Sequence, residues 1–387
     1  MGSTQGDARP LAGMVVLDLT RVLAGPFATL NLAQLGATVI KVEVPGTGDD
    51  SRHFPPFKDD ISLYYSSLNY DKKSIALDLR KPDDRIIFDR LLAKVDVLVE
   101  NFRPGTMDKL GYGFETVHAK HPALIYASVS GYGHNGPMSS QPAYDMVVQA
   151  QGGIMSITGE KDGDPVRVGV SIGDLAAGLY TVIAIQGAWI KKLQGAKGAR
   201  IDISMLDCQV ALLEGALTNY LALGRVAVPL GSRHGSIAPF QSFATSDSRM
   251  IIAGGNDRLF AQICESIGAP ELASDQRFLT NTLRIQNVEA MAEALEVKLR
   301  EKTTAEWVEL LRRAGVPCAP IQNVGQVAQD EQVLARNMIV SMQHPRFGEF
   351  RTAGSPVKMT GMPEIPQHQP PPELDQDRQW ILDWLKN

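Results

Sequence analysis

Short apolar strands alternate with helices through the first half of this sequence, and that alternation constrains the fold more than any other feature. Residues 14–19 have the pattern of a strand, residues 24–35 of a helix and residues 37–43 of the next strand. Such a β–α–β unit implies a parallel sheet with a right-handed crossover. The alternation continues, and further strands are predicted at residues 74–79, 96–100, 124–130 and 199–204. The sequence therefore predicts an α/β protein with a doubly wound sheet.

A change of composition marks a second, smaller domain. Residues 227–239 are rich in Gly and Pro, as linkers are. A hairpin and short helices then follow in place of further β–α units. We therefore expect a small α+β domain at residues 226–329, and a large domain made of residues 1–225 and 330–387.

The loops that follow the first strands are the expected place for a ligand. In an open α/β sheet, ligands bind beyond the carboxyl ends of the strands. This rule predicts a site over residues 21–26 and 43–52. Residues 45–56 are rich in Gly, Asp and Pro, a composition typical of functional loops. The pattern GxGxxG is missing after the first strand, which argues against a dinucleotide-dependent dehydrogenase.

Charge and cysteine content argue against several other classes. A formal net charge of −5 and a pI near 5.9 argue against nucleic acid or an anionic membrane as the main partner. No apolar run reaches the ~18 residues that a membrane-spanning helix needs. The three cysteines are far apart, which predicts neither a disulfide framework nor a metal site: Cys208, Cys264 and Cys318.

One acid stands at the start of a long apolar helix. Asp174 follows the glycine-punctuated turn of residues 169–173. An Asp in this place can cap the helix by accepting hydrogen bonds from its first N–H groups. A carboxylate in apolar surroundings is also poorly solvated and can attack an acyl group, and small neighbours would leave room for a bulky substrate. The local sequence leaves both interpretations open.

Short motifs occur in an order that resembles the family III CoA-transferases, the group that includes formyl-CoA transferase. Each motif is weak alone, but the ordered set is specific and extends from about Leu11 to Pro372. The motifs lie at residues 17–26, 35–43, 72–78, 99–105, 130–133, 173–174, 234–240, 254–257 and 314–321. Members that transfer CoA from succinyl-CoA to glutarate are most similar at residues 20–29, 48–52, 163–167 and 234–237.

The resemblance implies a fold, an assembly and an activity. It implies a Rossmann-like large domain, and a homodimer whose two chains are interlocked. The activity would be transfer of CoA from succinyl-CoA, or a related acyl-CoA, to a dicarboxylate such as glutarate. Asp174 matches the family's catalytic aspartate, which would pass through an aspartyl-CoA thioester. CoA thioesters would be substrates, with no permanently bound cofactor, in the cytoplasm or the mitochondrial matrix.

The residues that match the family's CoA-binding positions mostly follow predicted strands. They are Val22, Leu23, Val44, Leu77, Arg80, Asn101, Phe102, Arg103, Lys109, Tyr144 and Asp145. The three basic residues among them would supply charge for the phosphates of CoA, and each also fits an ordinary exposed charge. Asp145 equally fits a helix cap. Val44 stands where formyl-CoA transferase has an arginine, so one charged contact to CoA is in doubt.

A dicarboxylate acceptor needs a cation or hydrogen-bond donors for its distal carboxylate. The candidates are Arg52, Arg167, His234 and Ser236. Arg21 is a further candidate. Gly254 and Gly255 would form a mobile cover, since glycine backbones can approach an intermediate closely, although an ordinary hairpin-end turn has the same sequence. Leu23 replaces a glutamine of formyl-CoA transferase, which argues against oxalate and formate.

Other functions stay open at this point. Itaconate, malate or citramalate would serve as acceptor in place of glutarate. An α-methylacyl-CoA racemase shares the family's fold but needs a histidine where this sequence has Tyr144. A non-catalytic CoA-binding protein would have no use for Asp174 in its small-residue surroundings.

Overall fold

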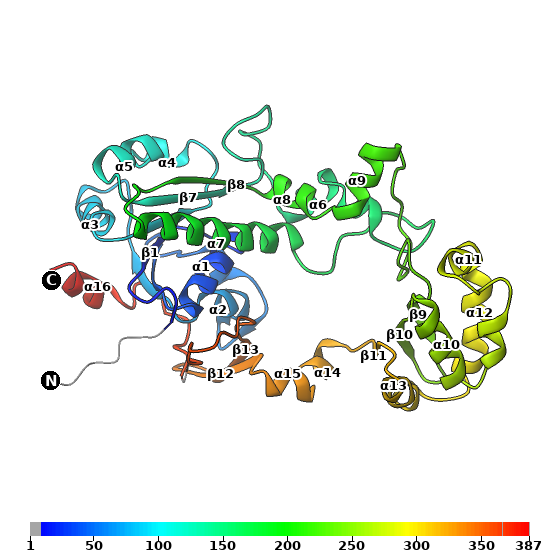
Figure 1. Cartoon of the computed structure of the whole chain (residues 1–387). Coiled ribbons are helices and arrows are strands. Elements are labelled where there is room, and N and C mark those ends of the chain that lie inside the picture. Colours follow the sequence, from blue (N-terminus) through cyan, green and yellow to red (C-terminus); the bar gives the residue numbers. More distant parts are fainter. Residues whose placement is uncertain (1–8, 366, 387) are drawn as a thin grey trace. The chain divides into compact units, whose positions relative to one another are not determined.

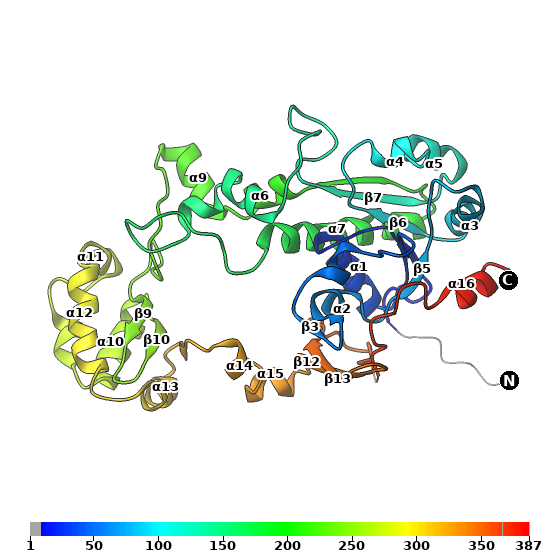
Figure 2. The same cartoon turned by 180° about the vertical axis from the view of Figure 1, so that it is seen from behind.

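The computed structural model describes residues 9–365 and 367–386, which form two compact units (Figure 1 and Figure 2). Unit 1 comprises Met1–Met155, Arg167–Val226 and Glu331–Asn387, and unit 2 comprises Ser156–Val166 and Ala227–Asp330. The sequence-based boundaries place residues 156–166 in the large domain. They belong to unit 2 instead, where Gly231 N–H donates to the Gly159 carbonyl at 2.9 Å.

Unit 1 is built on a six-stranded sheet in the order β5-β2-β1-β6-β7-β8, and every pair is parallel. The strands are β1 Val15–Asp18, β2 Thr38–Glu43, β5 Lys73–Ala76, β6 Val97–Glu100, β7 Ile125–Ser130 and β8 Arg200–Ser204. The strand order reverses between β1 and β6, which pair directly. Open α/β sheets form their ligand crevice at such a reversal.

Helices cover both faces of this sheet, because neighbouring residues of a strand point to opposite sides. Leu17 packs toward α3, α5 and α16, whereas Val16 packs toward α1 and α7. These helices are α1 Ala24–Gln34, α3 Pro82–Leu92, α5 Phe114–Lys120, α7 Ile172–Leu193 and α16 Arg378–Trp384. The predicted α/β fold with a parallel sheet is confirmed.

Shorter elements surround this core. The helices are α2 Leu63–Asn69, α4 Thr106–Lys109, α6 Asp145–Gln151, α8 Met205–Ala211, α9 Glu214–Leu223 and α15 Glu331–Ala335, with 3₁₀ turns η1 Asp50–His53 and η2 Ile154–Ile157. Two small hairpins pair β3 Phe57–Lys58 with β4 Ile61–Ser62, and β12 Ile339–His344 with β13 Gly348–Ala353.

Unit 2 packs helices on a three-stranded antiparallel sheet of order β11-β10-β9. The strands are β9 Phe240–Ala244, β10 Arg249–Ala253 and β11 Cys318–Pro320. The helices are α10 Asp257–Ser266, α11 Asn281–Gln286, α12 Val288–Leu299, α13 Thr304–Arg313 and α14 Val324–Val327, with the 3₁₀ turn η3 Pro270–Ser274. In the part of the chain that the structure describes, no helix has the length and apolarity that crossing a membrane requires.

Candidate active site

A cleft of about 700 Å³ opens at the carboxyl ends of β1 and β6, where the strand order reverses. The loop after β1, the loop after β6 and the start of α7 all contribute to its walls. The predicted site residues that line it are Val22, Leu23, Asn101, Phe102, Arg103, Tyr144 and Asp174. The rule for open sheets therefore located the cleft correctly from the sequence.

Asp174 lies half-buried in the first turn of α7, against the start of α1. Ala24, the first residue of α1, lines the same cleft as Asp174, and its backbone N–H favours the ionised Asp174 carboxylate. The pKa of Asp174 is raised to about 7, mainly by burial and further by the Asp145 carboxylate, while the Ala24 N–H opposes the rise. At neutral pH roughly half of Asp174 is therefore ionised, and this carboxylate has few solvating groups, which suits a nucleophile.

The capping role that the sequence allowed for Asp174 belongs to another residue. Ser171 is the N-cap of α7, but its side chain makes no capping bond. Asp145, at the start of α6, accepts a hydrogen bond from the backbone N–H of Gly173 at 2.8 Å. The Gln149 amide holds the other oxygen of Asp145 at 2.7 Å. Asp145 is buried and does not line the cleft, so it acts as a fixed carboxylate behind Asp174 rather than as a cleft-lining contact.

Two glycines of α7 allow close helix packing. A Cβ on Gly178 would lie 2.8 Å from the carbonyl oxygen of Ala24. A Cβ on Gly173 would lie 3.0 Å from the Asp145 carboxylate. Helices α1 and α6 can therefore approach α7 closely, which brings the Ala24 N–H to Asp174. The expectation that small residues leave room for a bulky substrate is wrong at these two positions.

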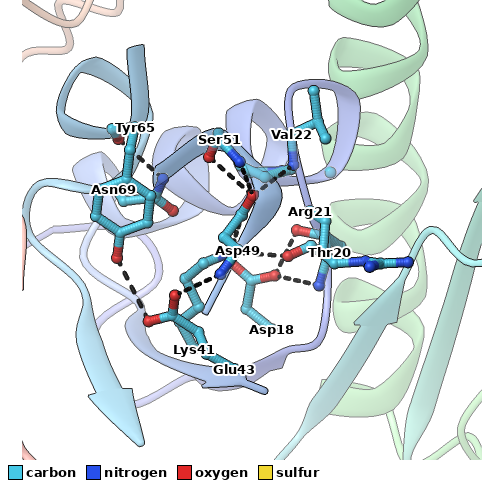
Figure 3. A network of polar contacts seen from close by, with 12 residues as sticks. Asp18, Thr20, Arg21, Val22, Lys41, Glu43, Asp49, Ser51, Tyr65 and Asn69 are labelled. Atoms are coloured by element: carbon cyan, nitrogen blue, oxygen red, sulfur yellow. Dashed lines mark hydrogen bonds and ion pairs between the residues drawn. The ribbon is translucent and has the colours of Figure 1, made fainter. Parts of the chain in front are cut away.

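The loop after β1 contains a strained residue. Val22 has a φ of 67°, in the left-handed region that β-branched residues rarely adopt. Such a conformation costs on the order of 1–3 kcal/mol and persists only where the surroundings enforce it. Here the Asn101 amide binds both the N–H and the C=O of Arg21 at 2.8 Å. The Val22 N–H donates to the Asp49 carboxylate at 3.1 Å, as Figure 3 shows.

Buried ion pairs lie under this loop. Lys41 pairs with Asp49 at 2.9 Å, and both side chains are 0% exposed. Lys72 pairs with Asp18 at 3.2 Å and is equally buried. Burial works to raise the pKa of Asp49, but Lys41 outweighs it and holds that pKa well below its usual range. Opposite charges thus stabilise each other in place of water (Figure 3).

A second cavity of about 320 Å³ adjoins the first. Arg21 and Phe102 line both cavities, and the Arg21 guanidinium carbon lies 5.1 Å from the centre of the Phe102 ring. The predicted residues that line the second cavity are Val44, Leu77, Arg80 and Phe102. Arg80 pairs with its neighbour Asp78 at 2.8 Å on the surface.

Other predicted residues lie elsewhere in unit 1. Arg52 donates from two nitrogens to Glu43, each at 2.7 Å, and also contacts the Tyr65 hydroxyl. The guanidinium of Arg52 is thus already bound to Glu43 and Tyr65, which argues against the expected role of Arg52 in binding a substrate carboxylate. Arg167 is exposed, donates to backbone carbonyls of its own turn and lines neither cavity. Lys109 is exposed and also lines neither cavity.

The remaining predicted residues belong to unit 2: His234, Ser236, Gly254 and Gly255. The two glycines form the turn between β10 and α10. The guanidinium of Arg284, fully buried, donates to the Gly255 carbonyl at 3.0 Å and to the Ala238 carbonyl at 2.7 Å. One arginine therefore joins the glycine turn to the segment that carries His234 and Ser236.

The sequence analysis did not single out Lys41, Asp49, Gln149 or Arg284. A lysine in the middle of strand β2, between the apolar Ile40 and Val42, is the signal that would have identified Lys41. Asp49 lies in the Gly-, Asp- and Pro-rich loop, where its partner could not be read from the sequence. Among residues 9–365 and 367–386, no group of three or more His, Cys, Asp or Glu side chains is placed to hold a metal ion.

Comparisons with known proteins agree on one family. The sequence profile of "CoA-transferase family III" matches residues 11–378. The chain is 44% identical over 368 residues to an acetyl-CoA:oxalate CoA-transferase from Acetobacter aceti, covering 95% of this chain and 93% of that protein. It is 42% identical over 385 residues to the succinyl-CoA:glutarate CoA-transferase of Mus musculus, covering 98% and 88%. A CAIB/BAIF family protein from Brucella suis has a TM-score of 0.88 and 37% identity, covering 97% and 99%.

Proposed function

The chain belongs to CoA-transferase family III, and we propose that it moves CoA from succinyl-CoA, or a related acyl-CoA, to a dicarboxylate, with Asp174 as the residue that carries the acyl group. The observation that carries this proposal is the half-buried Asp174 carboxylate, which lines the cleft together with Ala24 at the start of α1. Relatives named for glutarate and for oxalate both act on dicarboxylates, which supports that acceptor class.

The proposed reaction is a covalent relay on Asp174. Its carboxylate attacks the thioester carbonyl of the acyl-CoA, and CoA leaves as a thiolate, which gives a mixed anhydride. The thiolate attacks the Asp174 carbonyl carbon, the donor acid leaves as a carboxylate, and an aspartyl-CoA thioester remains. The acceptor carboxylate then displaces CoA to form a second anhydride. CoA attacks the acceptor carbonyl of this anhydride, which releases the new thioester and regenerates Asp174.

The two adjoining cavities offer CoA an extended site. The apolar walls from Val44, Leu77 and Phe102 suit an adenine ring. The pantetheine chain would pass the Arg21–Phe102 pair and reach Asp174 in the larger cleft. Phosphates would gain charge from the basic residues along this route, chiefly Arg103, which lines the cleft. Arg80 lines the smaller cavity, and Lys109 would act through its charge alone.

Arg21 is the candidate in unit 1 for the distal carboxylate of the acceptor. It lines the same cleft as Asp174, and its side chain is 41% exposed in an ion pair with Asp50. A substrate carboxylate would take the place of Asp50 on the guanidinium. His234 and Ser236 are further candidates, as is Arg167. Replacing Arg21 with Ala should raise KM for the dicarboxylate more than for the acyl-CoA, and equal increases would contradict this role.

Exclusion of water is a further requirement, because an anhydride hydrolyses readily. We propose that the turn at Gly254 and Gly255 covers the intermediate. Backbone without side chains can approach a reacting carbonyl closely.

We also propose that the chain functions as an interlocked homodimer. Helix α9 has no buried residue, and it exposes Tyr220, Leu221 and Leu223. Helix α7 exposes Leu179 and Ile183. Apolar side chains gathered on helices in this way are typical of interaction surfaces. Light scattering after size exclusion should give twice the chain mass, and a monomer would contradict the proposal.

The decisive experiment is to trap the intermediate. Hydroxylamine added during turnover should convert the acylated residue to a hydroxamate, and peptide mass analysis should find it on Asp174. A label on another residue, or none, overturns the proposal. A panel of acceptors from oxalate to adipate, with itaconate, malate and citramalate, would then rank kcat/KM by chain length. Oxalate is included because Leu23 argues against it while a relative at 44% identity uses it by name.

The racemase alternative is disfavoured at one position. Tyr144 lines the cleft and is 80% exposed, and it provides a phenol where that chemistry needs a histidine. Chiral analysis of a 2-methylacyl-CoA incubated with the enzyme should show no inversion.

A further inference from the structure

We propose that Lys41 is a positioning residue for Asp174. Together with Asp49 and Asn101, it fixes the strained loop after β1, and this loop leads into Ala24, the first residue of α1, which lines the same cleft as Asp174. The inference rests on the proposed role of Asp174 in acyl transfer. Lys41 itself lines neither the cleft nor the second cavity, so it acts through the loop.

The first half of the loop is held by Lys41 and Asp18. The Thr20 N–H donates to the Asp18 carboxylate at 2.8 Å. The Lys41 ammonium donates to the Thr20 carbonyl at 2.7 Å and pairs with Asp49 at 2.9 Å. Because Lys41 lies on β2, its side chain fastens the loop of one strand to the neighbouring strand (Figure 3).

The second half is held by Asn101 and Asp49. Asn101 binds both backbone polar groups of Arg21, and Asp49 accepts the Val22 N–H. Each backbone N–H and C=O from the Thr20 N–H to the Val22 N–H is therefore bound to a side chain. Such complete bonding is what a left-handed valine requires, because any free group would let the backbone relax.

Asp49 connects Lys41 to the strained residue Val22. One of its oxygens pairs with Lys41, and the other accepts hydrogen bonds from the Val22 N–H and from Ser51. Without the lysine, Asp49 would be a buried and unpaired charge, and it would move or take up a proton. Either change weakens the acceptor that holds Val22.

The consequence reaches Asp174 within two residues. Ala24 follows Val22 and Leu23 directly and begins α1. A relaxed Val22 would rotate the first turn of α1 and withdraw the Ala24 N–H from the Asp174 carboxylate. That N–H favours the ionised carboxylate, both in the resting enzyme and when Asp174 leaves the final anhydride. Its loss should slow turnover without weakening substrate binding to the same degree.

Lys72 provides a matched control. It is as buried as Lys41 and also pairs with an aspartate. Its other partners are Asn69, Thr29 and the Pro26 carbonyl. It therefore binds no backbone group of residues 20–22 directly and reaches the loop only through Asp18 and the first turn of α1. Replacement of either lysine with Met removes the same buried charge.

The test compares the pH profiles of kcat/KM for Lys41→Met and Lys72→Met. Active-site titration measures the fraction of folded enzyme, and the rates are corrected for it. Lys41→Met should lower kcat by about 30- to 100-fold, change KM by no more than about threefold and move the acid midpoint up by about one pH unit. Lys72→Met should lower the yield of folded enzyme and move the midpoint clearly less than Lys41→Met, because Asp18 keeps its hydrogen bonds from Thr20 and Thr29. The titratable groups that act on Asp174 are Asp145 of α6 and Tyr64 of α2, and neither is altered.

Asn101→Ala is the second variant, since it breaks both bonds to Arg21 without leaving a buried charge. It should shift the midpoint in the same direction even if Lys41→Met does not fold. An unmoved midpoint in Asn101→Ala, or an equal shift in Lys72→Met, overturns the inference. Turnover by Asp174→Asn would instead overturn the proposed function, so the two failures can be told apart.

Discussion

Two turns that follow strands are held in opposite ways in this molecule. The loop after β1 contains no glycine before α1, and buried ion pairs force Val22 into a left-handed conformation. The turn after β10 is formed by Gly254 and Gly255, and one buried cation, Arg284, binds its carbonyl. In the first turn, side chains bind each backbone N–H and C=O from the Thr20 N–H to the Val22 N–H. The second can adapt, because its own residues impose little.

Close packing rather than strain explains the glycines of the second turn. A Cβ on Gly255 would lie 1.8 Å from Ile237, and a Cβ on Gly254 would lie 2.3 Å from Ile263. The difference between the turns is consistent with their proposed roles: the loop after β1 orients the proposed nucleophile, and the turn after β10 covers it. The following predictions test that difference.

The largest effect is expected at Asp174, the proposed nucleophile. Asp174→Asn should lower kcat by about 10⁴-fold or more, because the amide cannot attack a thioester. Circular dichroism should be unchanged. Residual activity above about 1% would show that the first turn orients some other group.

Loss of the buried cation should damage unit 2 most. Arg284→Met should lower the free energy of unfolding by about 3–5 kcal/mol, because carbonyl groups and Asp257 lose their partner. Arg277→Met is the control, since Arg277 is an exposed arginine that pairs with its near neighbour Asp275, and its effect should stay within about 0.5 kcal/mol. Urea titration measures both. Equal effects would mean that the glycine turn does not depend on Arg284.

The pH profile addresses the first turn. The pKa of Asp174 is raised to about 7, so protonation removes the nucleophile as the pH falls below that value. The rate constant kcat/KM should fall about tenfold per pH unit below 7 and level off above it. Stopped assays between pH 5 and 9 would show this. A profile that is flat down to pH 5 would mean that Asp174 is solvated and its surroundings open.

Gly255→Ala should have a moderate effect on the second turn. The added methyl must displace Ile237, and kcat/KM should fall about tenfold while the Tm changes little. Adding Ile237→Ala should restore much of the loss by making room. Failure of this rescue would mean that the glycine is needed for its conformational freedom rather than for space.

The smallest effect concerns stability. The pKa of Asp174 is above its ordinary value of 3.8, so the folded state gains stability from proton binding at low pH and loses it as the pH rises through about 7. Asp174→Asn removes this dependence. Its Tm should exceed that of the native enzyme at pH 8, by on the order of 2 °C, and the difference should shrink toward pH 5. Scanning calorimetry at both pH values measures it.

Local patterns in the sequence predicted the features that depend on neighbouring residues. The apolar strands and their order of alternation gave the parallel sheet, and the sheet rule located the cleft. The ordered motifs identified the family, and with it Asp174 as the residue of interest.

Partners that lie far apart in the sequence could not be predicted in this way. The sequence predicted that Arg52 binds a substrate carboxylate, but in the structure Arg52 pairs with Glu43. It also predicted that Asp145 contacts CoA, but Asp145 accepts the Gly173 N–H at the start of α7. Lys41 and Asp49 belong to a strand and a loop whose side chains meet only in the folded chain. The sequence alone does not show whether a glycine leaves room for a substrate, allows a positive φ or permits close packing.

Because Lys41 and Asp49 are buried, their ion pair should respond to salt differently from the exposed charges of the cleft. Mobile ions screen exposed charges within about 10 Å at 0.1 M salt but act far less on pairs that exclude water. The exposed Arg103 should therefore lose much of its attraction for phosphates in concentrated electrolyte, whereas the loop after β1 keeps its shape. At high salt concentration, we therefore expect weaker binding of CoA but an unchanged position of Asp174, the proposed nucleophile.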